Sequence, residues 1–255
     1  MGEHTTWLDF LPGFDTLQNF MKIYFGRTWS NSMFPPQKHF TIVPVFMSLI
    51  VFLIILAVSI AYRKSSENSK KLTPSTRISF ISVTDLIIYN LRIITNDITG
   101  DEKLTKDIFP LITTLFLFIL VGNFIGLIPG FMPPGSTLQL NLAMALTVFI
   151  FTHYLGIRKH GFRYMKQFTG SYPLLAPLMI PIEILSHLSR PLSLTMRLLG
   201  NMFADHKVLS IFTFIFPLIV PIPFIFLGVL VSLIQALVFT LLSVIYFTLA
   251  CSDEH

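Results

Sequence analysis

Long apolar runs without charge most constrain what this chain can fold into. Residues 41–62 contain no charged side chain, and about 20 apolar residues are enough for a helix to cross the hydrocarbon layer of a bilayer. Similar runs cover residues 108–128, 138–157 and 222–250. They predict an all-α integral membrane protein in contact with the lipid bilayer, because so much apolar surface cannot be hidden in one water-soluble core.

Composition supports this class and excludes others. Of the 255 residues, 53% are hydrophobic and 12% are charged, against about 25% charged in soluble domains. The net charge of +5 does not predict a nucleic-acid partner, because the basic residues cluster at the ends of apolar runs. Cys251 is the single cysteine, so an internal disulfide and a multi-cysteine metal site are excluded, and we expect no metal and no cofactor.

Basic residues at the ends of the apolar runs predict the topology. Basic stretches lie at residues 63–71 and 158–166, whereas the turn at residues 129–135 carries no charge. The positive-inside rule then places the N-terminus outside and the C-terminus in the cytoplasm. Residues 1–40 lack the pattern of a signal peptide. We expect them to form an extracytoplasmic segment, followed by a single membrane domain over residues 41–255.

Residues 74–98 depart from the spanning pattern. Apolar side chains recur there at spacings of three and four, and charged residues interrupt them. This pattern predicts an amphipathic helix that lies on the cytoplasmic surface of the membrane or packs on a partner. The alternative is an ordinary soluble helix packed on a loop.

Residues 173–216 form an unusually long segment. As one helix they would measure about 66 Å, whereas the hydrocarbon layer is about 30 Å thick. We expect this segment to be strongly tilted, kinked at Pro181 and Pro191, or partly outside the layer. The expected fold therefore has about five crossing helices and one surface helix, and the last two crossings, 173–216 and 222–250, are long and strongly tilted.

Polar side chains form a line along this long segment. At 100° per residue, six of them fall within about 40° of one line. Charges at such depth cost about 2.5 to 3.5 kcal/mol each on insertion scales, and they usually face a partner, a water-filled cavity or an ion path. Simpler alternatives are that Arg190 and Lys207 reach the head groups, and that Asp205 pairs with Lys207 or with solvent. The six residues are Glu183, His187, Arg190, Arg197, Asn201 and Asp205.

Arg197 requires an opposite charge that the other predicted spans do not supply. Residues 41–62, 108–128, 138–157 and 222–250 contain no aspartate or glutamate. A salt bridge to another helix of this chain is the simplest alternative, but these spans offer no acid to form it. The economical inference is a carboxylate on a partner subunit.

One block of this segment has the spacing of a known family. Pro191 is followed six residues later by Arg197, and Gly200 and Asn201 come next. This block resembles the signature of subunit a of F-type ATP synthases of the bacterial type. Further matches in order and spacing are Glu183, residues 127–129 and residues 233–236.

The resemblance implies a stationary proton-channel subunit, which is not an enzyme by itself. In this family, two half-channels deliver protons to and from the carboxylates of a rotating ring of c subunits, and proton flow is thereby linked to ATP synthesis. The other implied partners are the b-subunit peripheral stalk and the remaining ATP synthase subunits. The implied location is the bacterial plasma (inner) membrane.

The resemblance also implies roles for single residues. Arg197 would be the essential barrier between the half-channels and the counter-charge to the ring carboxylate, because a guanidinium stays protonated and cannot relay the proton itself. The polar residues implied to line the proton path are Glu183, Ser193 (by a weaker match), Asn201, His206 and Gln235, the last of which would approach the arginine from the final helix.

One position departs from the family pattern. Many members carry an ionisable residue seven positions before the glutamine, where this chain has Gly228, and residues 208–252 contain no Asp, Glu, His, Lys or Arg. We hypothesise that His187, one turn from Glu183, supplies a titratable group of the proton path instead. His153 is the other candidate, and a hydrogen-bonded packing role is the alternative for it.

Three other classes of function compete with this interpretation. A secondary transporter often shows repeated halves, whereas this sequence shows no internal repeat. A structural subunit of a respiratory complex has no need for an arginine among acid-free spans. An independent enzyme is not expected, since the sequence has no phosphate-binding glycine loop, metal-ligand cluster or nucleophile arrangement.

Overall fold

The computed structural model describes residues 16, 43–68, 80–128, 131–161, 164, 176–215 and 221–252. Within these residues every regular element is a helix, which confirms the predicted all-α class. The elements are α2 (Val43–Asn68), α3 (Phe80–Thr99), α4 (Glu102–Gly126), the short 3₁₀ helix η2 (Pro134–Ser136), α5 (Leu138–His160), α6 (Ala176–Ile215) and α7 (Pro221–Cys251).

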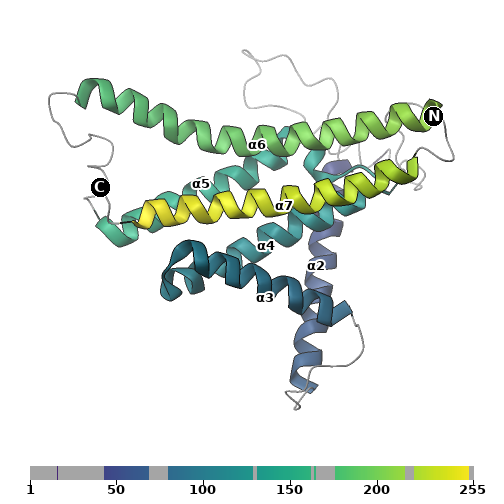
Figure 1. Ribbon diagram of the computed structural model, residues 1–255, viewed down its shortest axis with the longest axis horizontal. Helices are drawn as coiled ribbons and strands as arrows, with labels where there is room; N and C mark the ends of the chain where they lie inside the picture. The colour runs from purple at the N-terminus through teal and green to yellow at the C-terminus, as the bar shows by residue number, and fades with distance from the viewer. Residues whose placement is uncertain are drawn as a thin grey trace.

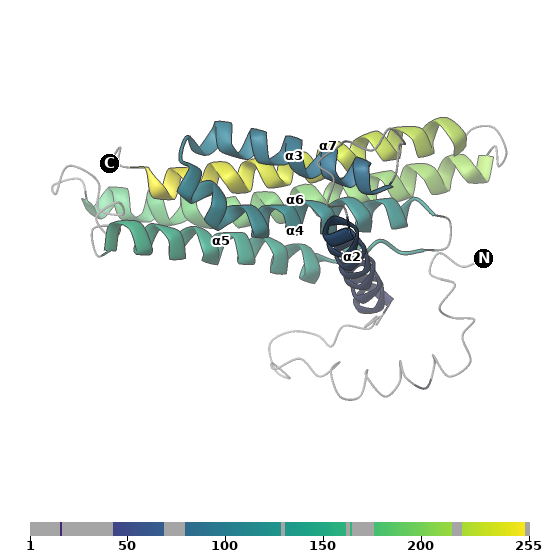
Figure 2. The ribbon, with the colours of Figure 1, turned by 90° about the horizontal axis from the view of Figure 1, so that it is seen from below.

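The long helices follow two directions (Figures 1 and 2). Helices α4, α5, α6 and α7 run along a common direction, and α3 packs against α4 and α7. Helix α2 crosses this bundle steeply and contacts α4 and η2. The helix that carries the polar line, α6, is held against α5 and α7.

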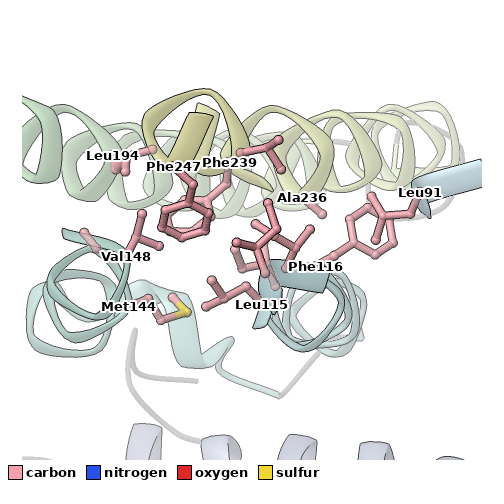
Figure 3. Packing of buried hydrophobic residues seen from close by; sticks show 14 of the residues in the cluster. Leu91, Leu115, Phe116, Met144, Val148, Leu194, Ala236, Phe239 and Phe247 are labelled. Atoms are coloured by element: carbon pink, nitrogen blue, oxygen red, sulfur yellow. The ribbon is translucent and has the colours of Figure 1, made fainter. Parts of the chain in front are cut away.

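A buried apolar core joins the helices of the bundle (Figure 3). Phe239 and Phe247 of α7 are the largest fully buried side chains in the described part of the chain. They lie in one cluster with Phe116 of α4, Val148 of α5 and Leu194 of α6. Helix α7 therefore anchors both α4 and α6 to the core.

Four described helices are long and apolar enough to cross a membrane. They are α4, α5, residues Val43–Arg63 of α2 and residues Ile222–Cys251 of α7. Helix α6 is not among them, so the predicted fifth crossing remains a prediction. Large apolar side chains such as Leu185 and Phe226 are 70% and 74% exposed, as expected of a surface that lipid or a partner covers.

Helix α6 is 40 residues long and continues through Pro181 and Pro191 (Figure 1). At 1.5 Å per residue its length is about 60 Å, twice the roughly 30 Å of the hydrocarbon layer. Neither proline interrupts the helix, so the length is not divided into two separate spans. A helix of this length has to be inclined or to extend beyond the layer.

The second span begins earlier than the apolar run predicts. Helix α4 starts at Glu102, before residue 108, because the side chain of Asp101 accepts a hydrogen bond of 2.8 Å from the backbone N–H of Lys103. Gly100, with a φ of 61°, turns the chain between α3 and this cap. The hydropathy pattern detects the apolar part of the helix and misses its capped polar start.

Helix α3 carries the predicted amphipathic pattern. It begins at Phe80, and residues 74–79 lie outside the described residues. Leu91 is buried in the core shared with α4 and α7 while Arg92 is exposed. The apolar side therefore packs on the long helices of the bundle, and the alternative of a helix packed only on a loop is wrong.

Polar contacts tie together the start of α4 and the ends of α5 and α7. Arg158 forms an ion pair of 3.1 Å with Asp107. Lys159 donates a hydrogen bond of 2.6 Å to the backbone carbonyl of Cys251. Gly161, with a φ of 57°, ends α5 three residues beyond the predicted end of that span. These three helix ends lie on one side, as the predicted topology requires.

We expect Gly126→Ala to destabilise the chain and Gly200→Ala not to. A Cβ atom at residue 126 would lie 2.6 Å from Cβ of Pro133, whereas nothing lies within 4 Å at residue 200. Overpacking costs about 1 to 3 kcal/mol, and alanine gains about 0.5 to 1 kcal/mol over glycine in an open helical position. Thermal unfolding of the purified subunit in detergent compares the two, and an unchanged transition for Gly126→Ala contradicts this packing.

Candidate functional site

The polar side chains of α6 lie in the line that helical spacing predicts, because the helix is continuous. His187 is buried, Arg197 and Asp205 are half-buried and Asn201 is exposed. This polar line therefore runs along the border between the face packed on α5 and α7 and the open face. Its members are Glu183, His187, Arg190, Arg197, Asn201 and Asp205.

Four polar side chains near the start of α6 form the His187 cluster (Glu183, His187, His153 and Tyr164). Nε2 of His187 lies 3.2 Å from Oε1 of Glu183, an ion pair when the imidazole is protonated. The ring centroids of His187 and His153 are 5.3 Å apart. Nδ1 of His153 lies 2.8 Å from the hydroxyl oxygen of Tyr164. The cluster thus connects α6 to α5 and to the chain beyond α5.

His153 has a packing role as well as a polar one. Its ring meets Phe149 edge to face at 4.4 Å, and it shares a hydrogen bond with Tyr164. The Tyr164 ring lies so close to Gly156 that a Cβ there would collide with it. Burial raises the pKa of the Tyr164 hydroxyl, so this hydroxyl stays protonated at neutral pH. These contacts support the hydrogen-bonded packing role considered for His153.

A small cavity of about 10 Å³, the His187 cavity, adjoins this cluster. His153, His187 and Arg190 line it together with Tyr246 of α7. Such a volume holds about one water molecule. The guanidinium carbon of Arg190 lies 5.4 Å from the centre of the Tyr246 ring, a cation–π contact that holds Arg190 against α7.

Arg197 lies between the His187 cluster and the far end of the polar line. Its side chain is half-buried, and within the described residues it takes part in no ion pair. Ser193, one turn away, is exposed on the same helix. The structure therefore offers no internal counter-charge among the residues it describes, and the carboxylate of a partner remains the predicted one.

Asn201 and Gln235 form a direct contact between α6 and α7. Nδ2 of Asn201 donates a hydrogen bond of 2.5 Å to Oε1 of Gln235. The amide nitrogen of Gln235 is buried and has no hydrogen-bond acceptor in the described chain. The family resemblance implies that Gln235 approaches Arg197, and its hydrogen bond to Asn201 places it beside the residue one turn beyond Arg197. The pair leaves one donor for water or for a group from outside the chain.

A larger cavity of about 130 Å³, the Asp205 cavity, lies at the other end of the polar line. Asn123 of α4, Asp205 of α6 and both Gly228 and Ser232 of α7 line it. From the sequence, Asp205 is a member of the polar line, with pairing to Lys207 or to solvent as the simpler alternative. Its place on the polar line was the signal for a functional role, but no sequence pattern shows that three helices leave a cavity around it.

The structure separates two residues that the sequence analysis compared. His187 lines the His187 cavity, whereas Gly228 lines the Asp205 cavity. The 18 residues from His187 to Asp205 span about 27 Å of helix, so His187 does not stand beside Gly228. The backbone of His206 belongs to α6, and its side chain lies outside the described residues.

In the part of the chain that the structure describes, every regular element is a helix and four helices are apolar enough to cross a membrane, which defines a multi-pass membrane protein. The family model described as ATP synthase A chain matches residues 45–248. The chain belongs to this family, whose members are membrane subunits of the ATP synthase complex and not enzymes on their own. Membership sets aside the transporter and respiratory-complex alternatives.

Curated relatives agree with this assignment. The chain is 48% identical to ATP synthase subunit a 2 of Syntrophotalea carbinolica over 67% of this chain and 72% of the relative. It is 54% identical to subunit a 1 of the same organism over 58% of this chain and 63% of the relative. It is 54% identical to ATP synthase subunit a of Geobacter sulfurreducens over 59% of this chain and 66% of the relative. The matched segments thus span about two thirds of these relatives.

We expect a double-mutant cycle of Asn201→Ala and Gln235→Ala to show a coupling of about 0.6 kcal/mol in the free energy of unfolding, as membrane hydrogen bonds commonly do. Removal of either amide breaks the same hydrogen bond. Thermal or denaturant unfolding in detergent measures the four chains. The control cycle combines Ser193→Ala with Gln235→Ala, and we expect the effects of these two substitutions to be additive. Additive effects of Asn201→Ala and Gln235→Ala would contradict the contact.

Proposed function

We propose that this chain is the stationary proton-channel subunit of a rotary ATP synthase. In this proposal two half-channels carry protons to and from the carboxylates of a rotating c-subunit ring, and the flow drives ATP synthesis on other subunits. The family match supports the assignment to the ATP synthase. The arrangement of polar groups on α6 supports the division into two half-channels.

The observation that carries the proposal is that Arg197 lies between two separate cavities. Arg197 follows His187 by about 15 Å and precedes Asp205 by about 12 Å along the helix axis, and it lines neither cavity. A fixed positive charge between two water-accessible spaces repels a proton that would pass directly from one to the other. The proton then has to leave the chain and travel on a moving carrier.

Arg197 is suited to meet that carrier. A guanidinium stays protonated at all relevant pH values and does not relay a proton. Without an internal carboxylate partner among the described residues, its charge remains available. The neighbouring Leu192 and Met196 are each 53% exposed. We infer that this apolar face receives the c-subunit ring, whose ionised carboxylate pairs with Arg197 as it passes.

The polar groups on either side of Arg197 form the two paths in this proposal. The Glu183–His187 pair belongs to the path on the side where the basic end of α5 lies. The positive-inside rule places this side in the cytoplasm. The Asn201–Gln235 pair belongs to the path on the other side. The proposed orientation therefore has the N-terminus outside and the C-terminus in the cytoplasm of a bacterial plasma membrane, with the b-subunit stalk as a further partner.

We expect Arg197→Ala to abolish ATP-driven acidification of inverted membrane vesicles while ATP hydrolysis continues. The variant removes the charge that holds the passing carboxylate ionised and blocks direct proton passage. Initial rates of acidification, ATP hydrolysis and passive proton leak are measured beside wild type. Arg92→Ala, which removes an exposed arginine of α3, is the matched control and should pump normally.

The same assay decides against the proposal in one case. If vesicles with normal amounts of the Arg197→Ala chain acidify at the wild-type rate, Arg197 is only a structural anchor and the chain does not use it as an ion barrier. Arg197→Lys separates charge from shape, because lysine keeps a positive charge but loses its proton more readily when buried. We expect it to pump poorly.

We expect His187→Ala and His187→Gln both to slow ATP-driven pumping, by about tenfold or more, if the imidazole exchanges protons. Glutamine preserves a hydrogen-bonding side chain beside Glu183 but does not titrate. Pumping rates in inverted vesicles, normalised to the amount of assembled subunit, give the comparison. Normal pumping by His187→Gln would assign the residue a packing role only, and normal pumping by His187→Ala would remove it from the path.

A further inference from the structure

The Asp205 cavity contains three polar side chains without partners in the described part of the protein. Asp205, Asn123 and Ser232 come from three different helices and line the same space. Asn123 and Ser232 are only 7% and 4% exposed. None of the three side chains takes part in a hydrogen bond or ion pair with the described chain. Buried polar groups in folded proteins normally have partners, so the cavity itself has to supply them.

Water is the partner that fits this cavity. A volume of about 130 Å³ is well above the roughly 10 to 15 Å³ that one water molecule needs, so the cavity accommodates several water molecules. A carboxyl group, an amide and a hydroxyl provide donors and acceptors from three walls, and buried water typically makes about three hydrogen bonds. Asp205 is the charged member among the residues that line the space.

At Gly228 the facing helix α7 contributes no side chain to the cavity. A Cβ atom at Gly228 would lie 2.6 Å from a terminal methyl carbon of Leu127. The Leu127 side chain thus occupies the place that a side chain of residue 228 would take. Asp205 lines the same cavity from α6.

Polar side chains continue from the cavity toward Arg197 along two helix faces. Asp205 and Asn201 are four residues apart on α6, and Ser232 and Gln235 are three residues apart on α7, so each pair shares one face. Asn201 and Gln235 are bonded to each other. Arg197 follows one turn further on. The polar groups therefore form successive levels that lead from the cavity to Arg197.

We propose that Asp205 is a proton-binding residue of this path, with Asn123 and Ser232 holding the water that reaches it. A hydronium ion in the cavity transfers its proton to a carboxylate oxygen of Asp205, which leaves one water molecule and a neutral carboxyl group. The carboxyl group then gives the proton to a water molecule on the side of Asn201 and Gln235 and becomes a carboxylate again. This inference rests on the proposed function and assigns the proton site of one half-channel.

The test measures ATP-driven acidification and ATP hydrolysis in inverted vesicles, and passive proton flow after removal of the catalytic subunits. Asp205→Asn keeps the shape of the side chain and removes the exchangeable acid. We expect its pumping and its passive flow to fall on the order of ten- to a hundredfold, with normal assembly. Asp205→Glu should retain most of the flow. Asp97→Asn, which changes an exposed acid of α3, is the matched control.

A second set of variants moves the carboxyl group to the facing helix. Asp205→Asn combined with Gly228→Asp and Leu127→Ala places an acid on α7 and clears the space that Leu127 fills. We expect this combination to restore proton flow above Asp205→Asn alone. No gain in flow from an assembled triple variant counts against a proton site in this cavity.

The outcomes separate this inference from the proposed function. If Arg197→Ala abolishes pumping while Asp205→Asn pumps normally, Asp205 is not a proton site and the channel function stands. If Arg197→Ala pumps normally, the proposed channel function is wrong, whatever the result for Asp205→Asn. A variant that does not assemble is replaced by Asp205→Cys in a Cys251→Ser background, probed with a small water-soluble methanethiosulfonate. Reaction in intact membranes supports a water-filled cavity, and protection from the reagent overturns it.

Discussion

The unbroken course of α6 is the constraint on which the two cavities and the place of Arg197 depend. Pro181 and Pro191 each remove a backbone donor, a change that costs a helix interior about 3 kcal/mol or more. Packing has to offset this, and Leu194 and Leu198, both nearly fully buried in the core, hold the middle of α6. Because the helix continues, side chains three and four residues apart stay in one line, and the charge of Arg197 keeps a fixed distance from each cavity.

The spans were predictable from the sequence because they depend on a local property, the apolar length needed to cross a bilayer. The earlier start of α4 was not, because it depends on one hydrogen bond between Asp101 and the backbone of Lys103. The side of α3 that packs was predictable from its periodicity. The helices on which α3 packs were not, because contacts between distant segments leave no periodic trace in the sequence.

The candidate site also has features that were predictable from the sequence and features that were not. The polar line on α6 follows from helical geometry alone, and Arg197 stands out because its neighbouring spans lack acids. The contact between Asn201 and Gln235, 34 residues apart, and the approach of His153 to His187 depend on how helices pack. Asp205 shows the limit most clearly, since the sequence places its carboxyl group on the polar line but does not show the cavity that it lines in the structure.

The distance of Asp205 from Arg197 matters as much as its cavity. At about 12 Å and an effective dielectric constant near 20, the two charges attract by about 1.4 kcal/mol, against about 4 kcal/mol at 4 Å. A carboxylate in direct contact with Arg197 would form a lasting ion pair. It would neutralise the charge with which the passing carboxylate has to pair. Two helical turns keep the attraction weak enough for Asp205 to bind and release a proton. A proton site at this spacing and an uncommitted arginine are therefore compatible on one helix.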